Sequence, residues 1–149
     1  MEETCLDTSV LIELARRKLL KYIDPSRDIF YLTEITLYEY LRGIRLLDRD
    51  IEKAKEALER LFYVIGFSNE VIKKASDIYS ILSKKGVIIP DPDILIASIC
   101  IIYNLSIASF DKHFESFREL GLRLCDPTEI INMLNRRKIA YEHRTKDRK

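Results

Sequence analysis

The chain has 149 residues, of which 47% are hydrophobic and 33% charged, with only four glycines and four prolines. This length suits one domain with a buried core, and the composition excludes a disordered or fibrous chain. The formal net charge of +1 does not indicate a nucleic-acid binder, and the lack of a signal peptide or a long apolar run leads us to expect a cytoplasmic protein that does not enter the membrane.

Short apolar strands alternate with amphipathic helices along the chain. We expect strands at residues 4–6, 29–32, 63–65, 105–108 and 122–124. The expected helix caps are Ser9, Thr33, Asp48, Ser68 and Asp91. Gly86 suits the left-handed stop of one helix, and Pro127 begins a last helix that ends near Arg137. Strands separated by helices require crossover connections, so we predict a three-layer α/β/α fold with a central parallel sheet.

The end of the chain is basic. Residues 136–149 hold seven Lys or Arg against Glu142 and Asp147, a net charge of +5, which leaves −4 on the other residues. This tail is compatible with an electrostatic arm for nucleic acid, but we favour the interpretation as a solvated terminus that keeps the protein soluble.

Four acids lie near expected strand ends or helix starts. Asp7 follows the first strand, and Asp111 follows the strand at 105–108. Asp93 lies in the first turn of the helix that enters this strand, and Glu39 lies inside the helix after the second strand. Ligands of an open parallel sheet bind beyond the carboxyl ends of its strands, where all four could converge. Clustered carboxylates repel unless a divalent cation neutralises them, and oxygen ligands favour Mg²⁺ or Mn²⁺. The pattern predicts metal-dependent phosphodiester hydrolysis.

Each acid also has a structural interpretation. Asp7 and Asp111 could cap a helix or a turn, Glu39 could lie at the surface, and Asp93 would favour the helix dipole in any orientation. His113, two residues after Asp111, is interpreted as a surface histidine. The sequence has no GxSxG motif and no plausible Cys/His pair, which argues against a serine or cysteine hydrolase.

Each of the four acids lies in a short motif, and the order and spacing of these four motifs are informative together. These segments are Leu6-Asp7-Thr8-Ser9, residues 35–43 around Glu39, Asp93-Ile94-Leu95-Ile96-Ala97, and Ser109-Phe110-Asp111-Lys112-His113-Phe114. They resemble the motifs of the PIN-domain family, particularly the VapC toxins of prokaryotic VapBC pairs, over about residues 4–137. The spacing to Ile96-Ala97 favours Asp93 over Asp91 at the third position, and Ser109 stands where threonine is commoner.

The resemblance implies a nuclease domain over residues 1–137, followed by a basic tail at 138–149. It implies an endoribonuclease that uses Mg²⁺ or Mn²⁺, acts on RNA, pairs with a VapB-like antitoxin and forms a homodimer. Carried over by position, the metal ligands are Asp7, Glu39 and Asp93, with Asp111 as a fourth acid. Supporting hydroxyl groups would come from Thr8, Ser9 and Ser109. Two alternatives stay open: an RNA-processing PIN nuclease outside a toxin system, and a catalytically silent PIN-fold interaction module.

Overall fold

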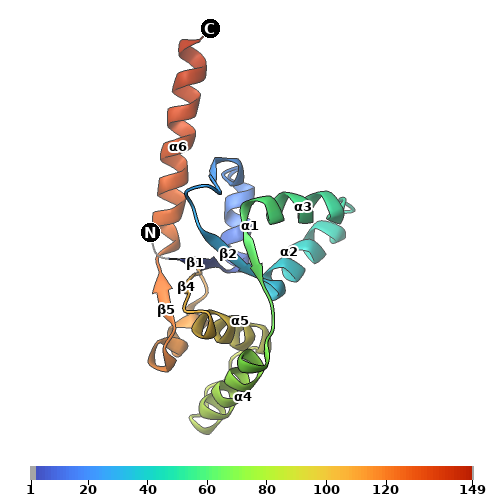
Figure 1. Cartoon of the computed structure of the whole chain (residues 1–149), viewed down its shortest axis with the longest axis vertical. Helices are drawn as coiled ribbons and strands as arrows, with labels where there is room; N and C mark the ends of the chain where they lie inside the picture. Colours follow the sequence, from blue (N-terminus) through green and yellow to red (C-terminus); the bar gives the residue numbers. More distant parts are fainter. Residues whose placement is uncertain (1–2, 149) are drawn as a thin grey trace.

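A parallel sheet lies between two layers of helices in the computed structural model, which describes residues 3–148 (Figure 1). Within this range the strands are β1 (Thr4–Leu6), β2 (Phe30–Thr33), β3 (Tyr63–Ile65), β4 (Ser106–Ala108) and β5 (Arg123–Cys125). Their order across the sheet is β3-β2-β1-β4-β5, and every neighbouring pair is parallel. The predicted three-layer α/β/α fold is confirmed.

Two hydrophobic cores, one on each face of the sheet, fix the layers. The α-helices are α1 (Thr8–Arg16), α2 (Glu34–Leu46), α3 (Ile51–Leu61), α4 (Asn69–Lys84), α5 (Asp91–Ile102) and α6 (Pro127–Asp147), with 3-10 helices η1 (Leu20–Tyr22) and η2 (Lys112–Leu120). Leu6 and Ala108 pack with side chains of α1, α2, α3 and α6. Cys5 and Ile107 pack with α4, α5 and η2. Successive strand residues point to opposite faces, so each strand supplies both cores.

The strand order places a topological switch point where β1 and β4 lie side by side. The chain leaves β1 for α1, which belongs to one core, and leaves β4 for η2, which belongs to the other. Connections that depart to opposite faces separate the two loops at the carboxyl ends of these strands. Ligands of open α/β sheets bind at such a switch point.

Several local predictions are confirmed. Thr33 caps α2, since its Oγ1 accepts a hydrogen bond from the Thr36 amide at 3.1 Å. Ser68 caps α4 in the same way, with the Val71 amide as donor at 3.2 Å. Gly86 has a φ of 73°, the left-handed conformation expected after this helix.

Three predicted helix caps are wrong, and some strand ends shift by one residue. The wrong caps are Ser9, Asp48 and Asp91, and the observed N-caps are Asp7, Asp50 and Pro90. Asp48 has a left-handed φ of 56°, whereas Asp50 accepts a hydrogen bond from the Glu52 amide at 2.9 Å. The other two helices begin earlier than predicted, so Ser9 and Asp91 already lie inside α1 and α5.

The last helix is longer than predicted. α6 continues past Arg137 to Asp147 and projects beyond the sheet (Figure 1). The Tyr22 and Tyr141 rings meet edge to face with centroids 6.1 Å apart, which ties its distal half to η1. α6 runs through the predicted boundary at residues 137 and 138 without a break, and the role of the basic tail stays a prediction. No helix in the described range is both long and apolar enough to span a membrane.

Candidate active site

Asp7 lies at the end of β1 and is held from several sides. Its amide donates to the Ala108 carbonyl at 3.0 Å, and its own carbonyl accepts from the Val10 amide at 3.0 Å. Its carboxylate Oδ2 accepts hydrogen bonds from Ser109 Oγ at 2.7 Å and Ser9 Oγ at 3.2 Å. The residue is only 6% exposed. These bonds fix the carboxylate between β1 and the loop after β4.

The loop after β4 is ordered by the same hydroxyl groups. The Asp111 amide donates to Ser109 Oγ at 2.9 Å, and the Phe110 amide donates to Ser9 Oγ at 3.2 Å. Asp111 caps η2, because its Oδ1 accepts from the His113 amide at 2.9 Å. The loop therefore places Asp111 beyond the carboxyl end of β4, on the same rim as Asp7.

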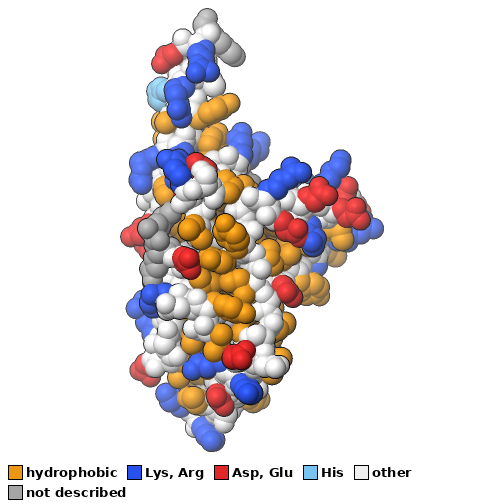
Figure 2. All heavy atoms as spheres, viewed as in Figure 1, with side chains coloured by type: hydrophobic (Ala, Val, Ile, Leu, Met, Phe, Trp, Pro, Cys, Tyr) orange, Lys and Arg blue, Asp and Glu red, His pale blue; other side chains and the backbone are white. Residues whose placement is uncertain are grey.

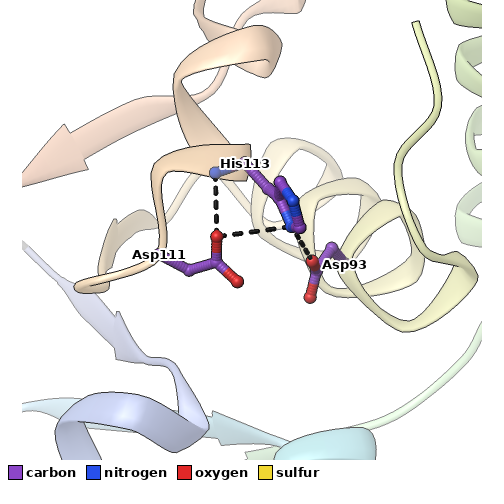
Figure 3. Close-up of side chains that lie close together, drawn as sticks. All are labelled: Asp93, Asp111 and His113. Atoms are coloured by element: carbon purple, nitrogen blue, oxygen red, sulfur yellow. Dashed lines mark hydrogen bonds and ion pairs between the residues drawn. The ribbon is translucent and has the colours of Figure 1, made fainter.

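Asp93, Asp111 and His113 form a compact group (Figure 3). Asp93 lies in the first turn of α5, and its side chain is 17% exposed. His113 Nδ1 lies 2.9 Å from Asp93 Oδ2 and 3.3 Å from Asp111 Oδ1. One ligand atom of each residue lies within 4.8 Å of the other two. Figure 3 shows the imidazole edge turned toward both carboxylates.

The charges of this rim act on one another. Burial raises the pKa of Asp93, the hydrogen bond from His113 opposes this rise, and the charges of Asp111 and Asp7 add to it, so that the net shift is upward. The hydrogen bond to Asp93 raises the pKa of His113, partial burial opposes the rise, and the Asp111 charge supports it. The three carboxylates thus form a negatively charged rim that favours a bound cation.

Glu39 borders this rim. It lies on α2 with its side chain 25% exposed, and its Oε1 accepts a hydrogen bond from Thr8 Oγ1 at 3.1 Å. Arg42 Nη2 lies 3.9 Å from the other carboxylate oxygen. The structure thus brings Asp93 and Asp111 into one compact group with His113. Asp7 lies outside this group, although its charge acts on Asp93, and Glu39 is linked to the residue after Asp7 through Thr8.

Asp91 and His113 were interpreted from the sequence as a helix cap and a surface histidine. Asp91 is exposed and lies outside the compact group, whereas Asp93 belongs to it. His113 is at the surface, as interpreted from the sequence, but that interpretation missed its contacts with both carboxylates. The available signal was its position two residues after Asp111 in a capped turn.

The PIN domain family model matches residues 4–120 of this chain. The chain belongs to the PIN domain family. Ribonuclease VapC1 of Methanocaldococcus jannaschii is 33% identical over 122 residues, which cover 81% of this chain and 85% of that protein. A VapC ribonuclease of Pyrococcus furiosus is 27% identical over 120 residues, 78% of this chain and 80% of that protein.

A solved PIN-fold structure has the same architecture. The structure of VapBC-1 from nontypeable Haemophilus influenzae superimposes with a TM-score of 0.68 at 21% identity, and the match covers 85% of this chain and 98% of that chain. At this identity the similarity establishes the fold. PIN nucleases use a divalent metal ion, and the donor set of this rim fits one, because it offers carboxylate oxygens and an imidazole nitrogen at close range.

Proposed function

We propose that this PIN protein is an endoribonuclease that hydrolyses RNA phosphodiester bonds with Mg²⁺ or Mn²⁺, and that it is the toxin of a VapBC-type pair. The acids at the switch point carry this proposal: the charges of Asp7 and Asp111 both act on Asp93, and Ser109 links the Asp7 carboxylate to the Asp111 amide. The 33% identity with Ribonuclease VapC1 supports the reaction and the RNA substrate.

Asp7, Asp93 and Asp111 would hold the cation, with Glu39 contributing from the border of the rim. Both hydroxyl donors to Asp7 bind Oδ2, so Oδ1 accepts no hydrogen bond from the described residues and stays available. Ser9 and Ser109 orient Asp7, and Thr8 orients Glu39. A bound Mg²⁺ or Mn²⁺ supplies polarisation of the scissile phosphate and activation of the attacking water.

A hollow of about 390 Å³ beside Asp111 suits a nucleotide next to the scissile phosphate. Its lining includes Ser109, Phe110 and Lys112. The ring of Phe110 is 48% exposed and offers a stacking surface, and Lys112 offers a charge for the RNA backbone. This side of the rim would bind RNA through stacking and phosphate contacts.

The antitoxin would dock on the α2–α3 hairpin, which projects from the sheet in Figure 1. A groove of about 550 Å³ there is lined by Tyr38, Leu41, Arg42, Arg45, Leu46 and Ile51. Leu46 is 82% exposed, and two arginines border the apolar floor. We assign the groove to an apolar antitoxin segment with acidic side chains. Arg42 also contacts Glu39, so this segment would end beside the metal rim.

Cleavage of a labelled single-stranded RNA tests the enzyme proposal. We expect cleavage by the wild type with Mn²⁺ or Mg²⁺, none with EDTA, and none by Asp7→Asn. Asp91→Asn is the matched control, since Asp91 is an exposed acid outside the site, and it should cleave like the wild type. Equal cleavage by Asp7→Asn would refute the site. A folded wild type that neither cleaves RNA nor binds Mn²⁺ in calorimetry would instead be a silent interaction module.

Inhibition by a co-purified small protein tests the toxin assignment. The co-purified small protein should block RNA cleavage by the wild type but should inhibit Leu46→Glu only weakly. Ile72→Glu is the control, since Ile72 is an exposed apolar residue on α4, and its RNA cleavage should be blocked like that of the wild type. Unchanged wild-type cleavage would remove the toxin assignment, and equal inhibition of all three proteins would exclude the groove. Light scattering of the chain alone tests the proposed homodimer, which would double the mass.

One observation favours an RNA-processing nuclease as the second candidate. Exposed cations follow one another along the projecting α6, and Figure 2 shows Lys and Arg side chains along it. Exposed Arg144, Lys146 and Arg148 have no carboxylate partner among the described residues. Unpaired cations on a projecting helix can contact the backbone of a long or structured RNA.

A further inference from the structure

The ring nitrogen Nδ1 of His113 faces the carboxylates of Asp93 and Asp111 (Figure 3). Its amide donates to Asp111 Oδ1 at 2.9 Å, which fixes the start of η2 against this carboxylate. Phe114 and Phe117 of η2 are buried in the same core as the α5 residues Ile94 and Ile96. The backbone of His113 is therefore held on both sides, and its ring reaches Asp93 from a fixed position.

The two distances from His113 Nδ1 to the carboxylates fit neighbouring ligands of one small cation. Ligands at right angles around a cation with bonds of about 2.1 Å lie about 3.0 Å apart. His113 Nδ1 lies 2.9 Å from Asp93 Oδ2 and 3.3 Å from Asp111 Oδ1. The nitrogen thus has the separation from each carboxylate that neighbouring ligands of one octahedral ion have.

The ring is also open to an entering ion. The side chain of His113 is 46% exposed and that of Asp111 40% exposed, whereas Asp93 lies deeper at 17%. An ion that approaches from the side of the imidazole therefore meets two exposed side chains before the partly buried carboxylate of Asp93.

We propose that His113 is a direct ligand of the divalent metal through Nδ1, together with Asp93 and Asp111. This inference rests on the proposed metal-dependent function and extends it, because the family resemblance supplied acidic ligands alone. As a ligand, Nδ1 would give up the proton that it shares with Asp93 Oδ2 and would offer its lone pair to the cation. If His113 only positioned Asp93, its nitrogen would keep that hydrogen bond and would not touch the ion.

Nitrogen ligation has a consequence for metal choice. Imidazole suits transition-metal ions, whereas Mg²⁺ prefers oxygen ligands. His113 therefore biases the rim toward Mn²⁺ over Mg²⁺. Loss of an outer-shell partner lowers metal affinity by about 10–100-fold, so loss of a direct ligand should lower the affinity for Mn²⁺ by at least about 10-fold. The affinity for Mg²⁺ should change less.

Pulsed electron paramagnetic resonance of the Mn²⁺-loaded protein tests this ligation directly. Bound imidazole nitrogen produces a characteristic modulation of the Mn²⁺ echo, and the chain has only two histidines. We expect the modulation in the wild type, its loss in His113→Ala, and its retention in His143→Ala, since His143 is exposed on α6. Calorimetry on the same proteins should give a lower ratio of Mn²⁺ to Mg²⁺ affinity for His113→Ala alone. Circular dichroism confirms that each variant is folded.

The possible results separate this inference from the proposed function. A wild type that binds Mn²⁺ and cleaves RNA without nitrogen modulation would overturn the ligand role of His113 and leave the nuclease intact. Modulation that persists in His113→Ala, or an unchanged affinity ratio, would also overturn it. A folded wild type that binds no Mn²⁺ would defeat both proposals.

Discussion

The ion pair between Arg137 and Asp28 leads to a quantitative stability prediction. Arg137 Nη1 donates to Asp28 Oδ2 at 2.5 Å, and Nη2 donates to Oδ1 at 2.9 Å. The Asp28 side chain is 1% exposed and that of Arg137 25%. Without the arginine, the Asp24 amide at 2.8 Å is the one hydrogen-bond donor that the described residues leave to the buried carboxylate, beside the more distant charge of Arg27. Breaking a buried pair from one side costs about 3–5 kcal/mol.

We expect Arg137→Met to lower the free energy of unfolding by about this amount. With an m-value of about 2 kcal/mol/M, the midpoint of urea unfolding should fall by about 2 M. Arg137→Lys should lose less stability than Arg137→Met, since lysine keeps the positive charge. It should still be less stable than the wild type, because an ammonium group does not form two parallel bonds to one carboxylate. Arg136→Met is the control: Arg136 is exposed and has no carboxylate partner in the described range, so its change should stay within about 0.5 kcal/mol.

The effect of pH on this pair has a defined sign. Burial raises the pKa of Asp28, but the hydrogen bonds from Arg137 and the Asp24 amide outweigh it, so the pKa is lowered overall. The pair therefore stabilises the fold above the unfolded pKa of about 3.9, and this stabilisation is lost as pH falls through the lower folded pKa. The difference in unfolding free energy between the wild type and Arg137→Met, measured by urea unfolding, should be largest near pH 6 and should shrink in acid. A difference in unfolding free energy below about 1 kcal/mol near pH 6, or a difference that grows in acid, would refute the stabilising role of the pair.

Three other predictions concern the metal rim and α6. Burial and the neighbouring charges raise the pKa of Asp93 despite the His113 bond, so metal-free protein loses stability as pH rises through that pKa. Without metal, Asp93→Asn should therefore have a higher melting temperature than the wild type near pH 7 in calorimetry. Mn²⁺ at 100 times its Kd should stabilise the wild type by about 2.7 kcal/mol but should not stabilise this variant. Ser109→Ala should slow RNA cleavage by about 10–100-fold because Asp7 loses its shortest hydroxyl contact, whereas Ser109→Thr should retain activity; equal rates would contradict this role. Replacing Arg144, Lys146 and Arg148 with glutamine should reduce the slope of the logarithm of RNA affinity against the logarithm of salt concentration by about 2. An unchanged slope would exclude α6 as an electrostatic arm for RNA. The charge-matched control, which should keep the slope, replaces three exposed lysines outside α6, namely Lys53 on α3 and Lys73 and Lys84 on α4.

The layers of the fold were predictable because the pattern of apolar residues is local. The neighbours Cys5 and Leu6 enter opposite cores, as do Ile107 and Ala108. Such short apolar strands between amphipathic helices leave one arrangement with both faces covered. The end of α6 was harder to predict, because its exposed distal half has no apolar stripe and depends on contacts such as that between Tyr22 and Tyr141.

The acids of the rim were predictable from their positions at strand ends and helix starts, since parallel strands bring these ends together. The partners that orient the acids were harder to predict. Arg137 counted as one charge of a basic tail in the sequence, and its partner Asp28 lies 109 residues away. Such pairs depend on how α6 crosses the sheet, which short motifs do not encode.

His113 illustrates the same limit at the metal rim. Its neighbour Asp111 is local, and a capped turn brings the two together from sequence alone. Its contact with Asp93 spans 20 residues and requires η2 to pack against α5 through Phe114 and Phe117. A motif can therefore name the acids that surround a cation, while the buried packing behind the motif decides whether a nitrogen completes the ligand set. If His113 binds the ion, these two phenylalanines contribute to metal selectivity without contacting the metal.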